Sequence, residues 1–278
     1  MVPRRFSQVD VFSEHPLGGN PVAVVHDADG LSEGQMAAFA RWTNLSETTF
    51  LLAPTVSAAD YRLRIFTPSG ELSFAGHPTL GSAHAWLTAH DPDRRGQLMQ
   101  ECAAGLVELE AGADNVAFVA PPLIHGDVAD DEDIAVAARL LDVQPDRILD
   151  ARWADNGPGF LGVLVADAAA VLSLRPRLAE AWPWPIGVVG THAPDGPADV
   201  EVRVFCPGLG VPEDPVTGSF NAAAAPWLLE RGTVASPYTV AQGTLLERTG
   251  RLNIRRDGAG RVWVAGRTIT LIEGTVRI

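Results

Sequence analysis

Cysteine, long apolar runs and positive charge are all scarce in this chain. Only two cysteines occur among its 278 residues, Cys102 and Cys206, and there is no CxxC spacing. A disulfide framework is therefore excluded, and a reducing compartment is expected. The stretch that comes nearest to a membrane-spanning run, residues 160–174, is interrupted by Asp167. The basic start is followed by no apolar segment of the kind that a secretory signal needs, so we expect a cytoplasmic protein.

The low positive charge excludes further classes of partner. The chain carries 21 Lys and Arg residues against 34 Asp and Glu residues, a net charge of −13 at pH 7. Nucleic acid and anionic membranes repel such a surface, so we expect neither as a partner. A small anion could still bind, because backbone N–H groups can form a local positive site. The length and the apolar content of 46% fit one large globular domain or two ordinary ones.

What the chain does contain is a repeat. Residues 63–82 read LRIFTPSGELSFAGHPTLGS, and residues 202–219 read VRVFCPGLGVPEDPVTGS. Both copies begin with apolar-Arg-apolar-Phe-x-Pro and end with x-Pro-x-x-Gly-Ser. The alignment sets His77 opposite Asp214, at an offset of about half the chain.

Each copy of the repeat predicts a strand, a loop and a helix in that order. Strands are expected at residues 62–66 and 201–205, helices at 82–87 and 221–229, and further helices at 32–43 and at either 134–143 or 168–182. Pro226 should bend or end the second of the repeated helices. We therefore predict an α+β fold of two similar halves, residues 1–120 and 121–267. Equivalent loops of the two halves are expected to meet across a cleft.

The two repeated helices begin in a way that suits anion binding. A helix N-terminus carries unpaired N–H groups and about half a positive charge. Two such ends aimed at one point would hold a carboxylate or a developing enolate. His77 and Asp214 would stand at these helix starts, and a histidine beside a carboxylate suits proton transfer near neutral pH. The alternative for both is a structural role, in which Asp214 caps the second helix and Pro215 is its first residue.

Four motifs together resemble one known family. They read VDVFSEHPLGGNPVAVV, NLSETTFL, FTPSGELSFAGHPTLGSAHAWL and EDPVTGSFNAAAAPWLL. In this order and spacing they resemble the PhzF-like family of phenazine-biosynthesis isomerases, as does the later segment AQGTLLERTGRLNI. The resemblance implies a diaminopimelate-epimerase-like fold, in which each of two pseudo-symmetric halves wraps a curved sheet around a central helix and the last strand, 268–278, returns to the first half. It also implies an active site between the halves, a homodimer, and chemistry that needs no metal or organic cofactor.

The resemblance assigns roles to individual residues. The acid–base residue of the family falls on Glu47, and its supporting residues fall on His77, Asp214 and Ser219. Substrate-binding residues are expected in the Gly-Asn-Pro and helix-start motifs, namely Asn20, Gly76, Thr79, Gly81, Ser82 and Gly218. A carboxyl group partly buried in a cleft has a raised pKa and can act as a base and then as an acid. From the residues alone, Glu47 could equally be an exposed acid at the start of a strand.

The residues argue against several other kinds of chemistry. The related epimerases and proline racemases place a cysteine at each helix start, where this chain has none, so a two-thiol mechanism is not expected. The segment GPGFLG at 157–162 leads into a strand instead of opening a helix, which argues against a dinucleotide site. Two functions remain open. The first is an isomerase or epimerase acting on a small carboxylate, cyclic in the favoured case; the second is a non-catalytic protein of the same fold that binds a metabolite or another protein.

Overall fold

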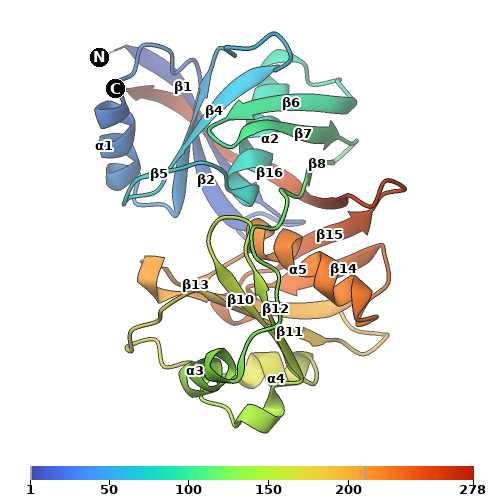
Figure 1. Cartoon of the computed structure of the whole chain (residues 1–278). Helices are drawn as coiled ribbons and strands as arrows, with labels where there is room; N and C mark the ends of the chain where they lie inside the picture. Colours follow the sequence, from blue (N-terminus) through green and yellow to red (C-terminus); the bar gives the residue numbers. More distant parts are fainter. Residues whose placement is uncertain (1, 210) are drawn as a thin grey trace. The chain divides into compact units, whose positions relative to one another are not determined.

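The computed structural model describes residues 2–209 and 211–278. The chain divides into two compact units (Figure 1). Unit 1 runs to Val119 and includes Ala265–Ile278, and unit 2 is Ala120–Val264. Within the described ranges, no helix is long and apolar enough to cross a membrane.

The two units are built from similar sets of elements. Unit 1 contains β1 (Pro3–Val11), β2 (Asn20–Val25), α1 (Glu33–Thr43), β3 (Glu47–Leu52), β4 (Tyr61–Phe66), β5 (Glu71–Leu72), α2 (Gly76–His90), β6 (Gly96–Cys102), β7 (Gly105–Ala111) and β8 (Asn115–Val119). Unit 2 contains α3 (Asp131–Leu141), β9 (Asp150–Ala154), β10 (Phe160–Leu164), α4 (Ala168–Ser173), β11 (Ile186–Thr191), β12 (Val200–Cys206), β13 (Val211–Asp214), α5 (Gly218–Glu230), β14 (Tyr238–Gln242) and β15 (Gly250–Arg256). The last strand, β16 (Val262–Arg277), belongs to both units.

The two units share one order of connections. In unit 1, β2 and β3 are parallel with α1 between them in sequence, β3 and β4 are antiparallel, and β4 and β6 are parallel with α2 between them. In unit 2 the same relations join β10 to β11, β11 to β12, and β12 to β14, with α4 and α5 as the connecting helices. The short strands β5 and β13 also correspond, since each folds back on the strand before it. The prediction of an α+β fold in two similar halves is confirmed.

Unit 1 is a ring of strands around α2. Strand β16 is hydrogen-bonded to both β8 and β1, so the order β1-β2-β3-β4-β6-β7-β8-β16 closes on itself. In Figure 1, β16 (red) lies beside β1 (blue). Helix α2 bonds to different parts of the ring, through Ser82 to Thr49 of β3 and through His84 to Thr270 of β16. Ten of its 15 residues are buried, as expected of a helix without a polar face.

Unit 2 is a sheet with helices on both faces. Along β10 and β11, one set of side chains joins a hydrophobic cluster with α3 and α4, and the alternate positions include glycines that face α5. A Cβ at Gly162 would lie 2.9 Å from the ring of Trp227, and a Cβ at Gly187 would lie 2.2 Å from the ring of Phe220. Glycine at these positions therefore lets α5 approach the sheet closely.

Two helices of unit 2 differ in length from those predicted from the sequence. Helix α3 covers residues 134–141 of the first expected segment, and α4 covers only Ala168–Ser173 of the second. Arg175 precedes Pro176, and a residue before proline avoids the helical conformation, so the helix ends early. Helix α5 continues through Pro226 to Glu230, so this proline does not end it.

A buried histidine makes the folded state of unit 1 sensitive to acid. His26 is 1% exposed, and its Nε2 lies 3.0 Å from the Ser7 hydroxyl. Burial, with a smaller contribution from Arg5, lowers the pKa of His26 from 6.5 to about 4. The folded state therefore resists protonation, so the stability from this group is intact above pH 6.5 and is lost as the pH falls towards 4.

We expect the free energy of unfolding to fall by about 2 kcal/mol between pH 7 and pH 5 because of His26. Urea denaturation at both pH values should show a smaller fall for His26→Gln than for the wild type. The exposed-histidine variant His15→Gln should fall as the wild type does. Equal falls in all three proteins would contradict this account.

Candidate active site

Glu47 begins β3 and is held in a mostly buried position. Helix α1 ends at Thr43, and the left-handed backbone of the next residue, Asn44 (φ 54°), turns the chain towards β3. Strand β3 then pairs in parallel with β2 at Val22. The Glu47 side chain is 16% exposed. Burial raises its pKa to about 7, against a smaller lowering by the nearby Ser46 side chain. The carboxyl group is thus close to half protonated near neutral pH, and the alternative of an exposed acid is wrong.

His77 lies beside this carboxyl group. It is the second residue of α2, its side chain is 6% exposed, and its Nε2 lies 3.3 Å from Glu47 Oε2. On the other side of the ring, Asn20 Nδ2 lies 3.4 Å from His77 Nδ1. An amide nitrogen can only donate, so in the neutral ring Nδ1 accepts and Nε2 carries the proton. Three of the residues predicted from the sequence are thereby brought together.

Two predicted hydroxyl groups of unit 1 are bonded to the surrounding strands. The Ser82 hydroxyl donates to Thr49 Oγ1 at 2.8 Å, and Gln100 Nε2 donates to Thr79 Oγ1 at 3.2 Å. Both serine and threonine are fully buried. These bonds fix α2 within the ring of strands, and direct contact of Thr79 and Ser82 with a substrate stays a prediction.

The predicted glycines of unit 1 hold different places in α2. Gly76 is its first residue, so its N–H has no partner within the helix. Gly81 faces the strands, where a Cβ would lie 2.4 Å from Val22 Cγ1 and 2.9 Å from Val11 Cγ2. Packing alone therefore requires glycine at position 81, and a role of either glycine in substrate binding stays a prediction.

Asp214 does not cap α5. It is the last residue of β13, whereas α5 begins at Gly218 with Thr217 as its N-cap. The expectation that Asp214 is the cap and Pro215 the first helical residue is therefore wrong. The reason is local, because the Thr217 hydroxyl donates to Asp214 Oδ2 at 2.6 Å and closes a turn ahead of the helix. His77 lies inside the first turn of α2, so the two aligned residues hold different positions relative to their helices.

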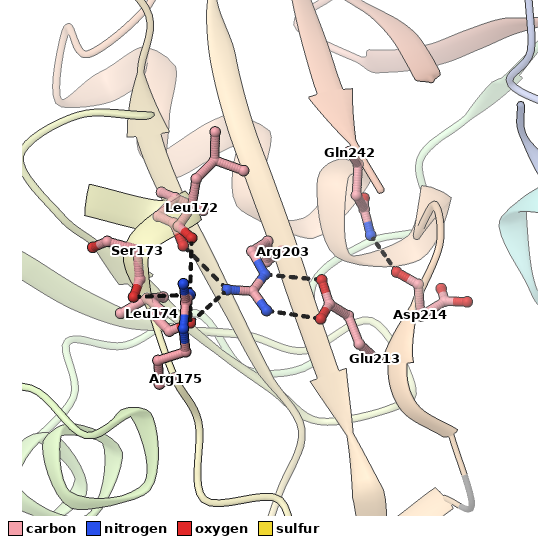
Figure 2. A network of polar contacts seen from close by, with 9 residues as sticks. Leu172, Ser173, Leu174, Arg175, Arg203, Glu213, Asp214 and Gln242 are labelled. Carbon is pink, nitrogen blue, oxygen red and sulfur yellow. Dashed lines mark hydrogen bonds and ion pairs between the residues drawn. The ribbon is translucent and has the colours of Figure 1, made fainter. Parts of the chain in front are cut away.

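Gln242 ties this turn to the sheet. It is the last residue of β14 and is 1% exposed. Its Nε2 donates to the Asp214 carbonyl at 3.0 Å and to Thr217 Oγ1 at 2.9 Å, as Figure 2 shows for the first of these bonds. Its Oε1 accepts from the Thr217 N–H at 3.0 Å and from Asn221 Nδ2 at 3.1 Å. This role could not be predicted from the sequence, although Gln242 stands in the quoted Gln-Gly segment, because its partners lie at least 21 residues away along the chain.

Gly218 and Ser219 open α5. Gly218 is buried and Ser219 is partly exposed. The carbonyl of Ser219 accepts a hydrogen bond from Asn156 Nδ2 at 3.0 Å, which fixes the first turn of the helix from the loop before β10. The roles predicted for Gly218 and for the Ser219 hydroxyl stay predictions.

Helices α2 and α5 start without a side-chain cap. The N-cap side chains of α1, α3 and α4 (Ser32, Asp130 and Asp167) each accept a bond from a first-turn N–H group. The N-cap residues of α2 and α5, Ala75 and Thr217, make no such bond. The first turns of these two helices therefore carry the partial positive charge of a helix start without a side-chain cap, which is compatible with the predicted anion site.

Each unit thus assembles its own part of the predicted set. Unit 1 supplies a carboxyl group with a pKa near 7 beside a histidine ring, and unit 2 supplies an aspartate in a rigid turn ahead of an uncapped helix. These are parts that can move a proton next to a bound anion. Among the residues that the structure describes, no group of three or more His, Cys, Asp or Glu side chains is placed to hold a metal ion.

Comparisons with known proteins identify one family. The family model described as phenazine biosynthesis-like protein matches residues 9–274. A trans-2,3-dihydro-3-hydroxyanthranilate isomerase of Pseudomonas chlororaphis is 34% identical over 277 residues, covering 96% of this chain and 97% of that protein. A Schizosaccharomyces pombe protein named antisense-enhancing sequence 1 is 35% identical over 294 residues, covering 99% of both. The crystal structure of a Bacillus anthracis phenazine biosynthesis protein of the PhzF family has the same fold, with a TM-score of 0.85, 22% identity and 100% of both chains covered. The chain therefore belongs to the phenazine biosynthesis-like family, the PhzF family.

Proposed function

We propose that this chain is a cofactor-independent isomerase that transfers a proton within a small carboxylate, with Glu47 as the acid–base group. Its assignment as an isomerase follows from the family, whose members at 34% identity are named isomerases. The proton-transfer mechanism and the carboxylate substrate go beyond this family assignment and are what we propose.

The observation that carries the proposal is the environment of Glu47. Its carboxyl group is mostly buried, its pKa is raised to about 7, and it lies 3.3 Å from His77 Nε2. A group that takes a proton from one carbon and returns it to another must be a competent base and a competent acid at the same pH. A pKa near 7 meets both needs in a neutral medium.

The proposed reaction needs no other proton carrier. The Glu47 carboxylate removes a proton from one carbon, and the electron pair of the broken C–H bond forms a new double bond to the neighbouring carbon, which displaces the π electrons of the existing double bond. The displaced π electrons then take the proton back from the carboxylic acid at a second carbon. One C–H bond breaks and one forms, no electrons are gained or lost, and Glu47 returns to its starting state. His77 Nε2–H would hold the carboxyl group in place through both steps.

Unit 2 would serve the same reaction through Asp214 and Ser219. The repeat supports this assignment, because these residues align with those at the start of α2. The uncapped first turns of α2 and α5, with Gly76 and Gly218, would bind the substrate carboxylate through backbone N–H groups. Asn20 would set the tautomer of His77. A homodimer and a cytoplasmic location, expected from the sequence, remain part of this proposal.

The substrate class is proposed from the charge of the site and from the relatives. Two helix N-termini favour an anion, and three Pseudomonas relatives are named for an isomerase of a dihydro-hydroxyanthranilate, which is a cyclic carboxylate. We therefore propose a small cyclic carboxylate with a proton that can be removed next to a double bond.

The test is deuterium uptake followed by NMR. The wild type and Glu47→Gln are incubated in D2O with a panel of cyclic and amino carboxylates that includes trans-2,3-dihydro-3-hydroxyanthranilate. Uptake or rearrangement by the wild type alone would support the proposal. Equal uptake by both proteins would remove Glu47 from the proposed role.

The alternative that the sequence left open is a non-catalytic protein of the same fold that binds a metabolite or another protein. In that case the wild type would catalyse no exchange, and compounds of the panel would perturb the NMR signals of the protein without being altered.

A further inference from the structure

A buried ion pair lies directly beside Asp214. Arg203 of β12 donates from Nε to Glu213 Oε1 at 2.9 Å and from Nη2 to Glu213 Oε2 at 2.8 Å. The two side chains are 6% and 9% exposed. Two parallel bonds of this kind fix the orientation of both groups as well as their separation. Figure 2 shows this pair and its neighbours.

Arg203 is itself fixed at its other nitrogen. Its Nη1 donates to the carbonyls of Val171 at 3.3 Å and Leu174 at 3.1 Å, at the C-terminal end of α4. The guanidinium also lies over the ring of Phe205, 4.8 Å from its centroid. The C-terminal end of a helix carries partial negative charge and favours a cation. Four hydrogen bonds and one ring therefore hold the guanidinium in a single position, and Glu213 is held with it.

A buried ion pair of this kind contributes little to the stability of a fold, but it can fix the orientation of the strand that carries it. Two buried charges lose hydration energy that their attraction barely offsets, and apolar residues of similar size often stabilise as well or better. Glu213 and Asp214 are neighbours on β13, so their side chains point to opposite sides of the strand. Figure 2 shows Glu213 pointing towards Arg203 and the Asp214 side chain pointing away from it. Holding the first in one orientation therefore sets the direction of the second.

We propose that Arg203 and Glu213 are positioning residues for Asp214. They orient the strand through its glutamate, while Gln242 bonds the Asp214 carbonyl and Thr217 bonds its carboxylate. The inference rests on the proposed function, in which Asp214 takes part in the proton transfer. Arg203 and Glu213 act through Asp214 and make no contact with the substrate.

Unit 1 contains a corresponding pair that lacks this connection. Arg64 of β4 bonds Glu71 of β5 at 2.7 and 2.6 Å, and its guanidinium lies 5.1 Å from the centroid of the Phe66 ring. The side chains of this pair are more exposed, at 18% and 28%. The loop 73–75 separates Glu71 from α2 and His77, whereas Glu213 adjoins Asp214. The Arg64–Glu71 pair is therefore a matched control.

The decisive variant replaces the buried pair with apolar side chains. Arg203→Met/Glu213→Leu should still fold, with a modest loss of stability because the carbonyls of Val171 and Leu174 lose their donor. With trans-2,3-dihydro-3-hydroxyanthranilate as the probe, its kcat should fall by about 10- to 100-fold with little change in KM, because a small misplacement of a reacting group costs that much. The control Arg64→Met/Glu71→Leu should keep the wild-type kcat. A wild-type kcat in the folded Arg203 variant would mean that the pair serves folding alone.

A conservative variant distinguishes the effect of the positive charge at position 203 from the effect of the two parallel hydrogen bonds to Glu213. The chain contains no lysine, so Arg203→Lys introduces a single lysine whose Nζ can be observed by selective 15N labelling. Lysine keeps the charge but not the planar fork of arginine. We expect a reduced kcat even though the Nζ signal reports a buried, paired ammonium group. Full activity of this variant would overturn the proposal.

A measurement without substrate keeps this inference separate from the proposed function. In aspartate-labelled protein, the 13C carboxyl signal of Asp214 is assigned with Asp214→Asn. The signal should shift or split in Arg203→Met/Glu213→Leu and stay in place in the Arg64 control; should the first variant not fold, Arg203→Lys is measured instead. An unchanged signal would overturn the positioning role. A shifted signal in a protein that turns over no compound would support the positioning role and overturn the proposed function.

Discussion

Glu47→Gln is expected to lower kcat by about a thousandfold or more. Glutamine keeps the size of the side chain but cannot take a proton from carbon, and a positioned general base contributes about 10²- to 10⁴-fold to the rate. His77 lies 3.3 Å away, but in the neutral ring its Nε2 carries the proton, so it offers no lone pair there. The change in KM should be small, because the amide occupies the same space.

The same substitution should stabilise the folded chain at alkaline pH. Burial raises the pKa of Glu47 from 4.5 to about 7, so the folded state favours the protonated form. Stability is therefore intact below pH 4.5 and is lost as the pH rises towards 7. Between pH 5 and pH 8 the wild type should lose about 2 to 3 kcal/mol of unfolding free energy through this group. Glu47→Gln should not show this loss.

Two measurements on the same proteins check these expectations. Deuterium uptake and steady-state kinetics report the activity, and urea denaturation at pH 5 and pH 8 reports the stability. Glu230→Gln, at an exposed glutamate of α5, is the control and should change neither. A Glu47→Gln protein that is inactive yet gains the same stability at both pH values would show that the carboxyl group is not held near a pKa of 7.

Local sequence pattern was sufficient to place the strands and helices of the repeat. The alternating segments 62–66 and 201–205 lie in β4 and β12, and the small apolar segments 82–87 and 221–229 lie in α2 and α5. In each of these elements the apolar residues contact the core of one unit. The short strands β5 and β13 could not be predicted in this way, because two to four residues are too few to show a period.

Bonds between distant side chains explain where the prediction of the site failed. In the segment Asp-Pro-Val-Thr, the side chain of either Asp214 or Thr217 could have accepted a capping bond from the first turn of α5, and both choices satisfy local rules. The structure closes a turn between the two instead, and Gln242 holds that turn from a strand 25 to 28 residues further along the chain. The motif singled out Glu47 as the acid–base candidate, and its raised pKa depends on burial by the folded unit.

Gly187→Ala is expected to destabilise the chain by about 3 kcal/mol, at the upper end of the usual cost of overpacking. A Cβ at this position of β11 would lie 2.2 Å from two atoms of the Phe220 ring. The ring cannot retreat freely, because Phe220 is fully buried and packs edge-on against Phe160 at 5.5 Å between centroids. Phe220 follows Ser219 in the first turn of α5, so relief of the clash must move the start of this helix. We therefore expect kcat to fall as well, by about tenfold.

A double-mutant cycle tests whether the ring is the cause. Phe220→Leu alone leaves space and should cost about 1 to 2 kcal/mol, and the same space should accommodate the new methyl group. Gly187→Ala/Phe220→Leu should therefore be more stable than the sum of the single effects predicts. Gly34→Ala is the matched control, because a Cβ there meets nothing within 4 Å, and alanine in α1 should stabilise by about 0.5 to 1 kcal/mol. If the two effects are additive, the Phe220 ring is not the cause, and the cost of Gly187→Ala comes from elsewhere in β11. The packing of this strand then does not determine the position of Ser219.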